Sequence, residues 1–174
     1  MSGPNSAPEI GQQNYRTPKG FLAACQRRFD LPGGFDWDLA CTEQDCVGTA
    51  GGYWFPEMDA LAQDWSALAL PGITAWVNPP FAQAGAFCGK AAASSARVLA
   101  LVPVAIGTRW WQQHVHRKAV VAGVGRLVFD MPDGTPVLSK DGKPQSINRD
   151  CALLAYNVLP IGTDWYLLEN WRNW

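Results

Sequence analysis

The chain has 174 residues, of which 48% are apolar and 17% charged, which is typical of one folded domain and excludes a largely disordered protein. The formal net charge is −1 with 14 lysines and arginines, so only a local basic face, and no overall positive field, can draw it to nucleic acid. We expect no N-terminal signal segment and no membrane association, because no apolar run approaches membrane-spanning length.

The first predicted element is a helix that follows a flexible start. Residues 1–15 are rich in Ser, Gly, Pro, Asn and Gln, which predicts a flexible N-terminal arm before a single domain of residues 16–174. Thr17 and Pro18 predict the beginning of the helix, with the threonine hydroxyl as its cap and proline in its first turn. The apolar spacing of "KGFLAACQRRFD" extends this helix over residues 19–30.

Two predicted strands come next, and each ends in polar residues. The alternation in "FDWDLA" predicts a strand over residues 35–40, with Asp36 and Asp38 on one face. A glycine-rich loop and a short helix over residues 57–65 follow. The segment "TAWV", residues 74–77, is the second strand, and the sequence Asn-Pro-Pro-Phe follows it directly.

The rest of the chain alternates between helices and strands. Helices are predicted over residues 84–95 and 108–119, and strands over residues 97–104, 120–124, 126–129 and 150–156. Residues 130–149 contain two Asp-Gly turns and predict a polar loop or hairpin insert. This alternation predicts an α/β fold, with a mainly parallel sheet flanked by helices.

The cysteines and histidines do not predict a metal site. The five cysteines are an odd number at irregular spacing, and we interpret them as reduced, mostly buried thiols of a cytosolic protein. Cys41 and Cys46 lack zinc-finger spacing and a second pair. His114 and His116, two residues apart on a predicted helix, point to different faces.

The Asn-Pro-Pro-Phe turn has two interpretations. Neither Pro79 nor Pro80 can donate a backbone hydrogen bond, so the strand stops at about Asn78, which the following proline keeps extended. On its own, the turn fits two roles equally well: it could simply end the strand, or it could bind a ligand. Together with the acids of the preceding strand it favours binding, because open α/β sheets bind ligands beyond the carboxyl ends of their strands.

The turn presents groups that suit a flat base with an exocyclic amine. Such an amine is a poor nucleophile, because its lone pair is delocalised into the ring. Asn78 Oδ1 and the carbonyl oxygen of Pro79 are two acceptors for its hydrogens, and Phe81 can stack on the base. A strand-end acid suits a hydroxylated or cationic ligand. A weaker alternative treats Asp36-x-Asp38 as the metal-nucleotide motif of a sugar transferase.

A wider set of segments gives a specific resemblance. It runs, in order, "TPKGFLAACQRRF", "FDWDLACTE", "YWFPEMDALAQDW", "AWVNPPF", "VLALVP", "TRWW" and "GRLVF", from about residue 16 to 157. This set resembles the phage-type, Dam-like DNA N-6-adenine-methyltransferase family. The resemblance implies a Rossmann-like methyltransferase domain that uses S-adenosylmethionine and methylates adenine in DNA, and it implies the cytoplasm of a bacterial host as its location.

The resemblance also implies roles for individual residues. The target-amine site would consist of Asn78, Pro79, Pro80 and Phe81. The donor pocket would be lined by Thr17, Pro18, Asp38, Asp59 and Asp64. One departure affects this pocket: no compact Gly-x-Gly follows Asp38, and the glycines of "TAGGYW" lie too far downstream to replace it directly.

The DNA-binding surface and two alternative functions remain open. Basic residues that could contact phosphates, or form an ordinary solvated surface, are Arg109, Arg117, Lys118 and Arg126, with Lys140, Lys143 and Arg149 on the insert. One alternative is methylation of cytosine N4 or of RNA, and another is a catalytically silent nucleic-acid-binding domain. The sequence predicts a short or relaxed recognition site and does not specify an oligomeric state.

Overall fold

The computed structural model describes residues 15–42, 46–48, 51–159, 166–167 and 171–174. The predicted arm therefore lies outside the described residues, apart from Tyr15. The helices are α1 (Lys19–Arg28), α2 (Ala84–Ala93) and α3 (Arg109–His114). The strands are β1 (Trp37–Asp38), β2 (Gly52–Tyr53), β3 (Ala75–Val77), β4 (Val98–Pro103), β5 (Val120–Gly125), β6 (Cys151–Tyr156) and β7 (Tyr166–Leu167). Short 3-10 helices cover Pro56–Met58, Trp65–Ala69, Phe81–Gln83 and Trp171–Asn173.

The described strands form one seven-stranded sheet in the order β2-β1-β3-β4-β6-β5-β7. The first four strands in this order are mutually parallel, and β5 is parallel to β7. Strand β6 runs antiparallel to both β4 and β5. The predicted α/β fold with a mainly parallel sheet and flanking helices is confirmed.

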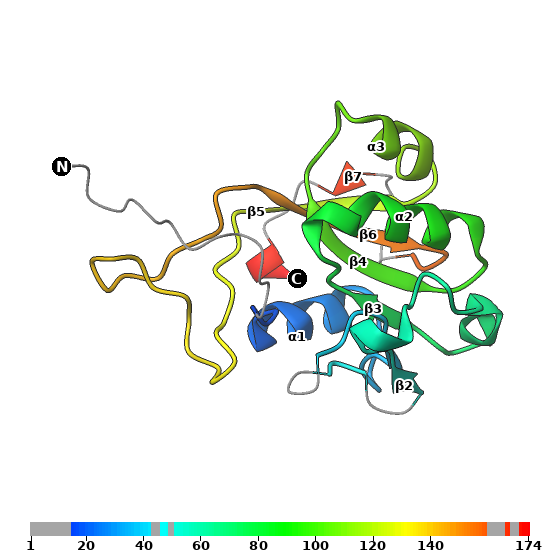
Figure 1. The fold of residues 1–174 in the computed structure, drawn as a ribbon, viewed down its shortest axis with the longest axis horizontal. Coiled ribbons are helices and arrows are strands. Elements are labelled where there is room, and N and C mark those ends of the chain that lie inside the picture. The colour runs from blue at the N-terminus through cyan, green and yellow to red at the C-terminus, as the bar shows by residue number, and fades with distance from the viewer. Residues whose placement is uncertain (1–14, 43–45, 49–50, 160–165, 168–170) are drawn as a thin grey trace.

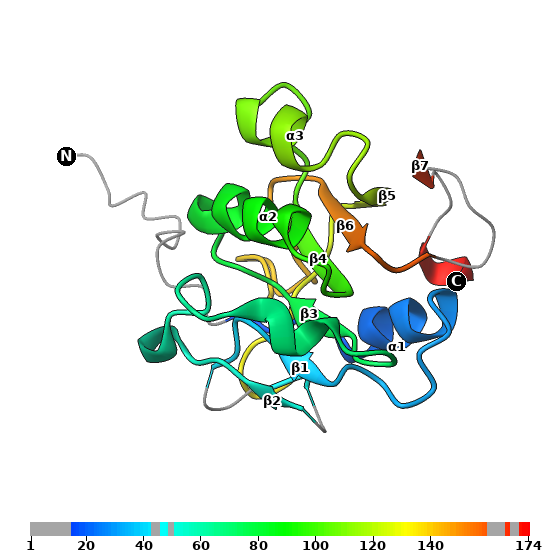
Figure 2. The same ribbon diagram turned by 90° about the vertical axis from the view of Figure 1, so that its right-hand side faces the viewer.

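Apolar side chains cover both faces of the sheet. On one face Phe21 and Cys25 of α1 pack against Trp76, Leu99 and neighbouring residues. On the other face α2 and α3 pack against alternate positions of the same strands. Figure 2 shows the resulting three layers, with α1 on the side of the sheet opposite to α2 and α3. The continuous apolar run of β4 is explained by this arrangement, because both faces of a central strand are buried.

The long connection between β5 and β6 extends away from the sheet, as the yellow and orange segment in Figure 1. Residues 126–129, predicted as a strand, do not join the sheet. Instead, Phe129 accepts a backbone hydrogen bond from Val137, and Asp130 pairs with Arg16. The predicted insert is therefore held at its base by the residues that precede α1.

Several predicted boundaries are wrong. The first strand is shorter than predicted, and a second strand, β2, follows in the glycine-rich segment. Two 3-10 helices replace the helix predicted over residues 57–65, since Asp59 adopts a φ of 44° that ends the first of them. Helix α3 ends at His114 rather than at residue 119, and Arg117 beyond it has a φ of 57°.

The structure corrects the prediction that all cysteines are reduced. Cys41 and Cys46 form a disulfide, with their Cα atoms 5.0 Å apart. Cys25, Cys88 and Cys151 are buried free thiols, as predicted. Burial raises the pKa of the Cys88 thiol to about 11 and that of Cys151 to about 12, and it raises the pKa of Cys25 further. At neutral pH these three thiols are therefore protonated and shielded from reagents.

Alkylation of the native protein tests this pairing. We expect iodoacetamide to label none of the five cysteines before reduction, because two form the disulfide and three are buried. After mild reduction, exposed Cys46 reacts first and buried Cys41 follows. Peptide mass spectrometry measures the alkylation of each cysteine. Labelling of Cys46 without any reductant would contradict the disulfide.

In the part of the chain that the structure describes, no helix combines the length and the apolar character needed to cross a membrane. Nor do three or more His, Cys, Asp or Glu side chains of these residues gather in a group able to hold a metal ion.

Candidate active site at the ends of β1 and β3

The chain changes direction across the sheet between β1 and β3. From β1 it moves to β2 on one side, and it then returns to β3 on the other side of β1 and continues outward to β4. In open α/β sheets, ligands bind beyond the carboxyl ends of the strands at the point where the strand order reverses in this way. The last residue of β1 is Asp38, and Asn78 directly follows β3. The fold therefore brings the two predicted polar strand ends to one place.

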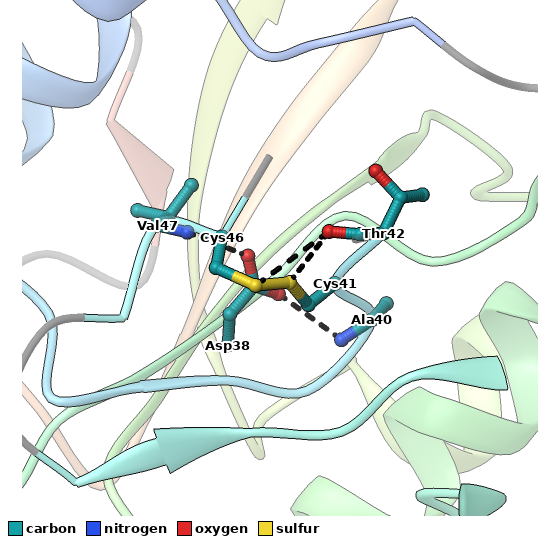
Figure 3. The surroundings of a disulfide bond; sticks show 6 residues. All are labelled: Asp38, Ala40, Cys41, Thr42, Cys46 and Val47. Atoms are coloured by element: carbon teal, nitrogen blue, oxygen red, sulfur yellow. Dashed lines mark hydrogen bonds between the residues drawn. A yellow bond between two sulfur atoms is a disulfide. The ribbon is translucent and has the colours of Figure 1, made fainter. Parts of the chain in front are cut away.

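Asp38 organises the loop that leaves β1. Its side chain is buried, at 3% exposure. One carboxylate oxygen accepts a hydrogen bond from the Ala40 amide at 3.1 Å, and the other accepts from the Val47 amide at 2.9 Å. Figure 3 shows the carboxylate between the two limbs of the loop, with the Cys41–Cys46 disulfide beside it. The loop is thus closed both by a covalent bond and by the buried acid.

Gly48 allows the returning loop to lie directly against the backbone at the end of β1. A Cβ atom on Gly48 would lie 2.6 Å from the backbone nitrogen of Asp38 and 2.7 Å from the carbonyl carbon of Trp37. Only glycine fits there, because both neighbouring atoms belong to the backbone. Gly48 therefore lies against β1 although it is ten residues after Asp38 in the sequence. Neither Gly48 nor Val47 is predicted from the sequence, because the glycine of a donor site is expected directly after the acid.

The Asn-Pro-Pro-Phe turn connects β3 to α2. Asn78 is half-buried, Pro79 is buried and Pro80 is exposed. Phe81 begins a 3-10 helix that runs into α2, and its half-buried ring packs beside the α1 face of the core. The Asn78 carboxamide donates a hydrogen bond from Nδ2 to Thr17 Oγ1 at 3.3 Å.

Thr17 does not cap α1, contrary to the prediction. The cap residue of α1 is Pro18, whose carbonyl oxygen accepts hydrogen bonds from the backbone amides of Phe21 and Leu22. The Thr17 side chain is 7% exposed and meets Asn78 instead. With Pro18 at the cap, the Thr17 side chain bonds elsewhere, to the turn after β3.

Two further acids predicted for the donor pocket have local hydrogen-bonding roles. The exposed Asp59 carboxylate accepts from the Leu61 amide at 3.2 Å. Asp64 accepts from the amide and the hydroxyl of Ser66, and these hydrogen bonds lower the pKa of its carboxyl. Asp64 also lines an open hollow of about 430 Å³ with Ser94 and other residues that precede β4. This hollow lies toward the amino end of β4, and a donor-binding role for either acid remains a prediction.

The four basic residues predicted to contact DNA lie at two edges of the sheet. Arg109 begins α3, beyond the carboxyl end of β4, and Arg126 directly follows β5. Arg117 and Lys118 precede β5, so the length of that strand, roughly 17 Å, separates them from Arg126. Arg126 Nε lies 3.8 Å from a carboxylate oxygen of Asp150, with both side chains exposed. Arg109 and Arg126 therefore share the edge on which Asp38 and Asn78 lie.

Residues 5–158 match the family model described as DNA N-6-adenine-methyltransferase (Dam). The chain belongs to this family. The match covers most of the sequence, including Thr17, β1 and the turn after β3, and it confirms the predicted resemblance. No curated protein matches the chain. Membership of the DNA N-6-adenine-methyltransferase family implies an enzyme that methylates adenine, with DNA as its substrate.

Replacement of Gly48 tests whether the loop packs on β1. We expect Gly48→Ala to destabilise the protein by about 1–3 kcal/mol, because its methyl group would overlap the backbone of β1. Chemical denaturation measures the change. The matched control is Gly20→Ala in α1, where a Cβ meets no atom within 4 Å and alanine favours the helix. Equal stability of the two variants would show that Gly48 does not approach Asp38 this closely.

Proposed function

We propose that this protein transfers the methyl group of S-adenosylmethionine to the N6 amine of adenine in DNA, at the edge of the sheet where β1 and β3 end. The proposal includes a Rossmann-like methyltransferase domain, which the four parallel strands and the reversal of strand order support. The observation that supports this proposal most strongly is the pair of strand ends. In a member of this family, a buried acid and an Asn-Pro-Pro-Phe turn end two adjacent parallel strands.

The residues at the end of β1 fit a methyl donor with a cationic sulfonium and a ribose. A buried carboxylate favours a nearby positive charge, and strand-end acids hold ribose hydroxyls in other nucleotide sites. Asp38 and the loop folded on it by Gly48 would hold the donor, with Thr17, Pro18 and Asp59 nearby by family resemblance. The donor, once bound, supplies an electrophilic methyl group.

The residues after β3 suit the target amine. Asn78 Oδ1 and the carbonyl oxygen of Pro79 accept its two hydrogens, which favours the pyramidal, more nucleophilic amine. Pro79 is buried, and it has no N–H that would compete for the carbonyl acceptors. The Phe81 ring, half-buried at the same turn, would stack on the base. These groups recognise an amine on a ring, and the family match favours adenine over cytosine and DNA over RNA.

The reaction is a direct transfer without a covalent enzyme intermediate. Adenine N6 attacks the methyl carbon as the carbon–sulfur bond breaks, the electron pair of that bond neutralises the sulfonium, and the methylated amine releases a proton to solvent. Catalysis then depends on positioning and on hydrogen-bond acceptors arranged in advance. In duplex DNA the adenine must first leave the base stack. Of the four basic residues predicted to contact DNA, Arg109 and Arg126 lie at this edge and would hold the phosphates.

A methyl-transfer assay tests the function. The protein is incubated with labelled S-adenosylmethionine and unmethylated DNA, and the digested nucleosides are separated by mass. We expect N6-methyladenine from the wild type and a loss of roughly a hundredfold or more in turnover with Asn78→Ala, because one of the two acceptors is removed. Donor affinity, measured by calorimetry, should remain within about threefold, since Asp38 and its loop are unchanged.

The control for this assay is Gln113→Ala, which removes an exposed carboxamide on α3 and should leave turnover unchanged. If N4-methylcytosine is the product, the proposed mechanism stands but the substrate base is cytosine rather than adenine. A folded wild-type protein that binds DNA but yields no methylated base would support the silent binding domain and overturn the enzymatic proposal.

A further inference from the structure

The carboxamide of Asn78 is held by a residue near the start of the folded chain. Its Nδ2 donates to Thr17 Oγ1 at 3.3 Å, across a separation of 61 residues. A carboxamide has one end that donates hydrogen bonds and one that accepts them. With Nδ2 on Thr17 Oγ1, the accepting end of the carboxamide, Oδ1, points away from Thr17.

Thr17 is itself held from both sides. Before it, Arg16 and Asp130 exchange two backbone hydrogen bonds, from Arg16 N to Asp130 O at 2.8 Å and from Asp130 N to Arg16 O at 3.0 Å. After it, Pro18 begins α1. The side chain is 7% exposed, so water has little access to its hydroxyl. The backbone that carries this hydroxyl is thus held by α1 on one side and by the base of the insert on the other.

We propose that Thr17 is a positioning residue for methyl transfer, whose hydroxyl orients the Asn78 carboxamide with Oδ1 toward the target amine. This inference rests on the proposed function. It assigns Thr17 to the amine site, whereas the family resemblance implies a place in the donor pocket.

The orientation matters because the target amine also donates hydrogen bonds. With Oδ1 toward the base, the carboxamide accepts an amine hydrogen. Rotated by half a turn, it presents its own N–H groups to those of the base, and the acceptor is lost. The Thr17 hydroxyl accepts from Nδ2 and so holds the carboxamide in place while Oδ1 accepts from the base, and a neutral hydrogen bond of this kind is worth about a factor of ten in an equilibrium.

Two substitutions at Thr17 separate the hydroxyl from the shape of the side chain. Thr17→Val keeps the shape and removes the hydroxyl, and we expect it to lower kcat about tenfold, with the KM for DNA and the dissociation constant for S-adenosylmethionine within twofold of the wild type. Thr17→Ser keeps the hydroxyl and should retain most of the turnover. Thermal unfolding verifies that both variants are folded. In ¹⁵N-labelled protein, the side-chain amide resonances of Asn78, assigned with Asn78→Ala, should shift in Thr17→Val and stay near their positions in Thr17→Ser.

Any of the following results would contradict the inference. If Thr17→Val weakens donor binding as much as it lowers kcat/KM, Thr17 belongs to the donor pocket. If Thr17→Val is as active as the wild type, or if the Asn78 resonances do not move, the hydroxyl does not orient the carboxamide. A wild-type protein that forms no N6-methyladenine removes the proposed function and the inference with it. An active wild type beside an equally active Thr17→Val variant overturns the inference alone.

Discussion

The pairing of β1 with β3 is the constraint on which the candidate site depends. Within the described residues β1 is only two residues long, and Trp37 and Asp38 pair in parallel with Ala75 and Trp76 of β3. Backbone hydrogen bonds from Asp36 to Thr74 and from Leu39 to Trp76 continue this contact at both ends, each at 2.9 Å. Because parallel neighbours end at the same edge, this short pairing fixes the acid beside the Asn-Pro-Pro-Phe turn.

Each half of the site is then stiffened by contacts from distant parts of the chain. Val47 and Gly48 fold back on the end of β1, where the Cys41–Cys46 disulfide closes the intervening loop. Thr17 reaches the turn after β3, and the base of the insert holds the backbone beside it. These contacts arrange both halves of the site in advance, as the proposed mechanism of positioning and electrostatics requires.

The sequence predicted the parts of the fold that depend on local pattern. The apolar run of β4, the helices α1 and α2 and the stop at Asn78 follow from periodicity and from the chemistry of proline. The missed features depend on contacts between distant residues. Strand β2 is two residues long. Gly51 before it and Gly52 within it are typical of a loop, and only the structure shows the Trp37 indole packed against them. The role of Gly48 and the disulfide depend on a loop that returns to its starting strand. The Thr17–Asn78 hydrogen bond spans 61 residues, and no local pattern predicts it.

The proposed function requires that the donor and the target base meet at the shared edge of β1 and β3. A crystal structure with S-adenosylhomocysteine, the product left after the methyl group is transferred, tests it most directly. We expect its ribose and amino-acid portion beside Asp38 and the loop that ends at Gly48, and its sulfur facing the Asn78 side chain. Density for the product in the hollow beside Asp64 and Lys90, or no sulfur within reach of the Asn-Pro-Pro-Phe turn, would contradict the claim.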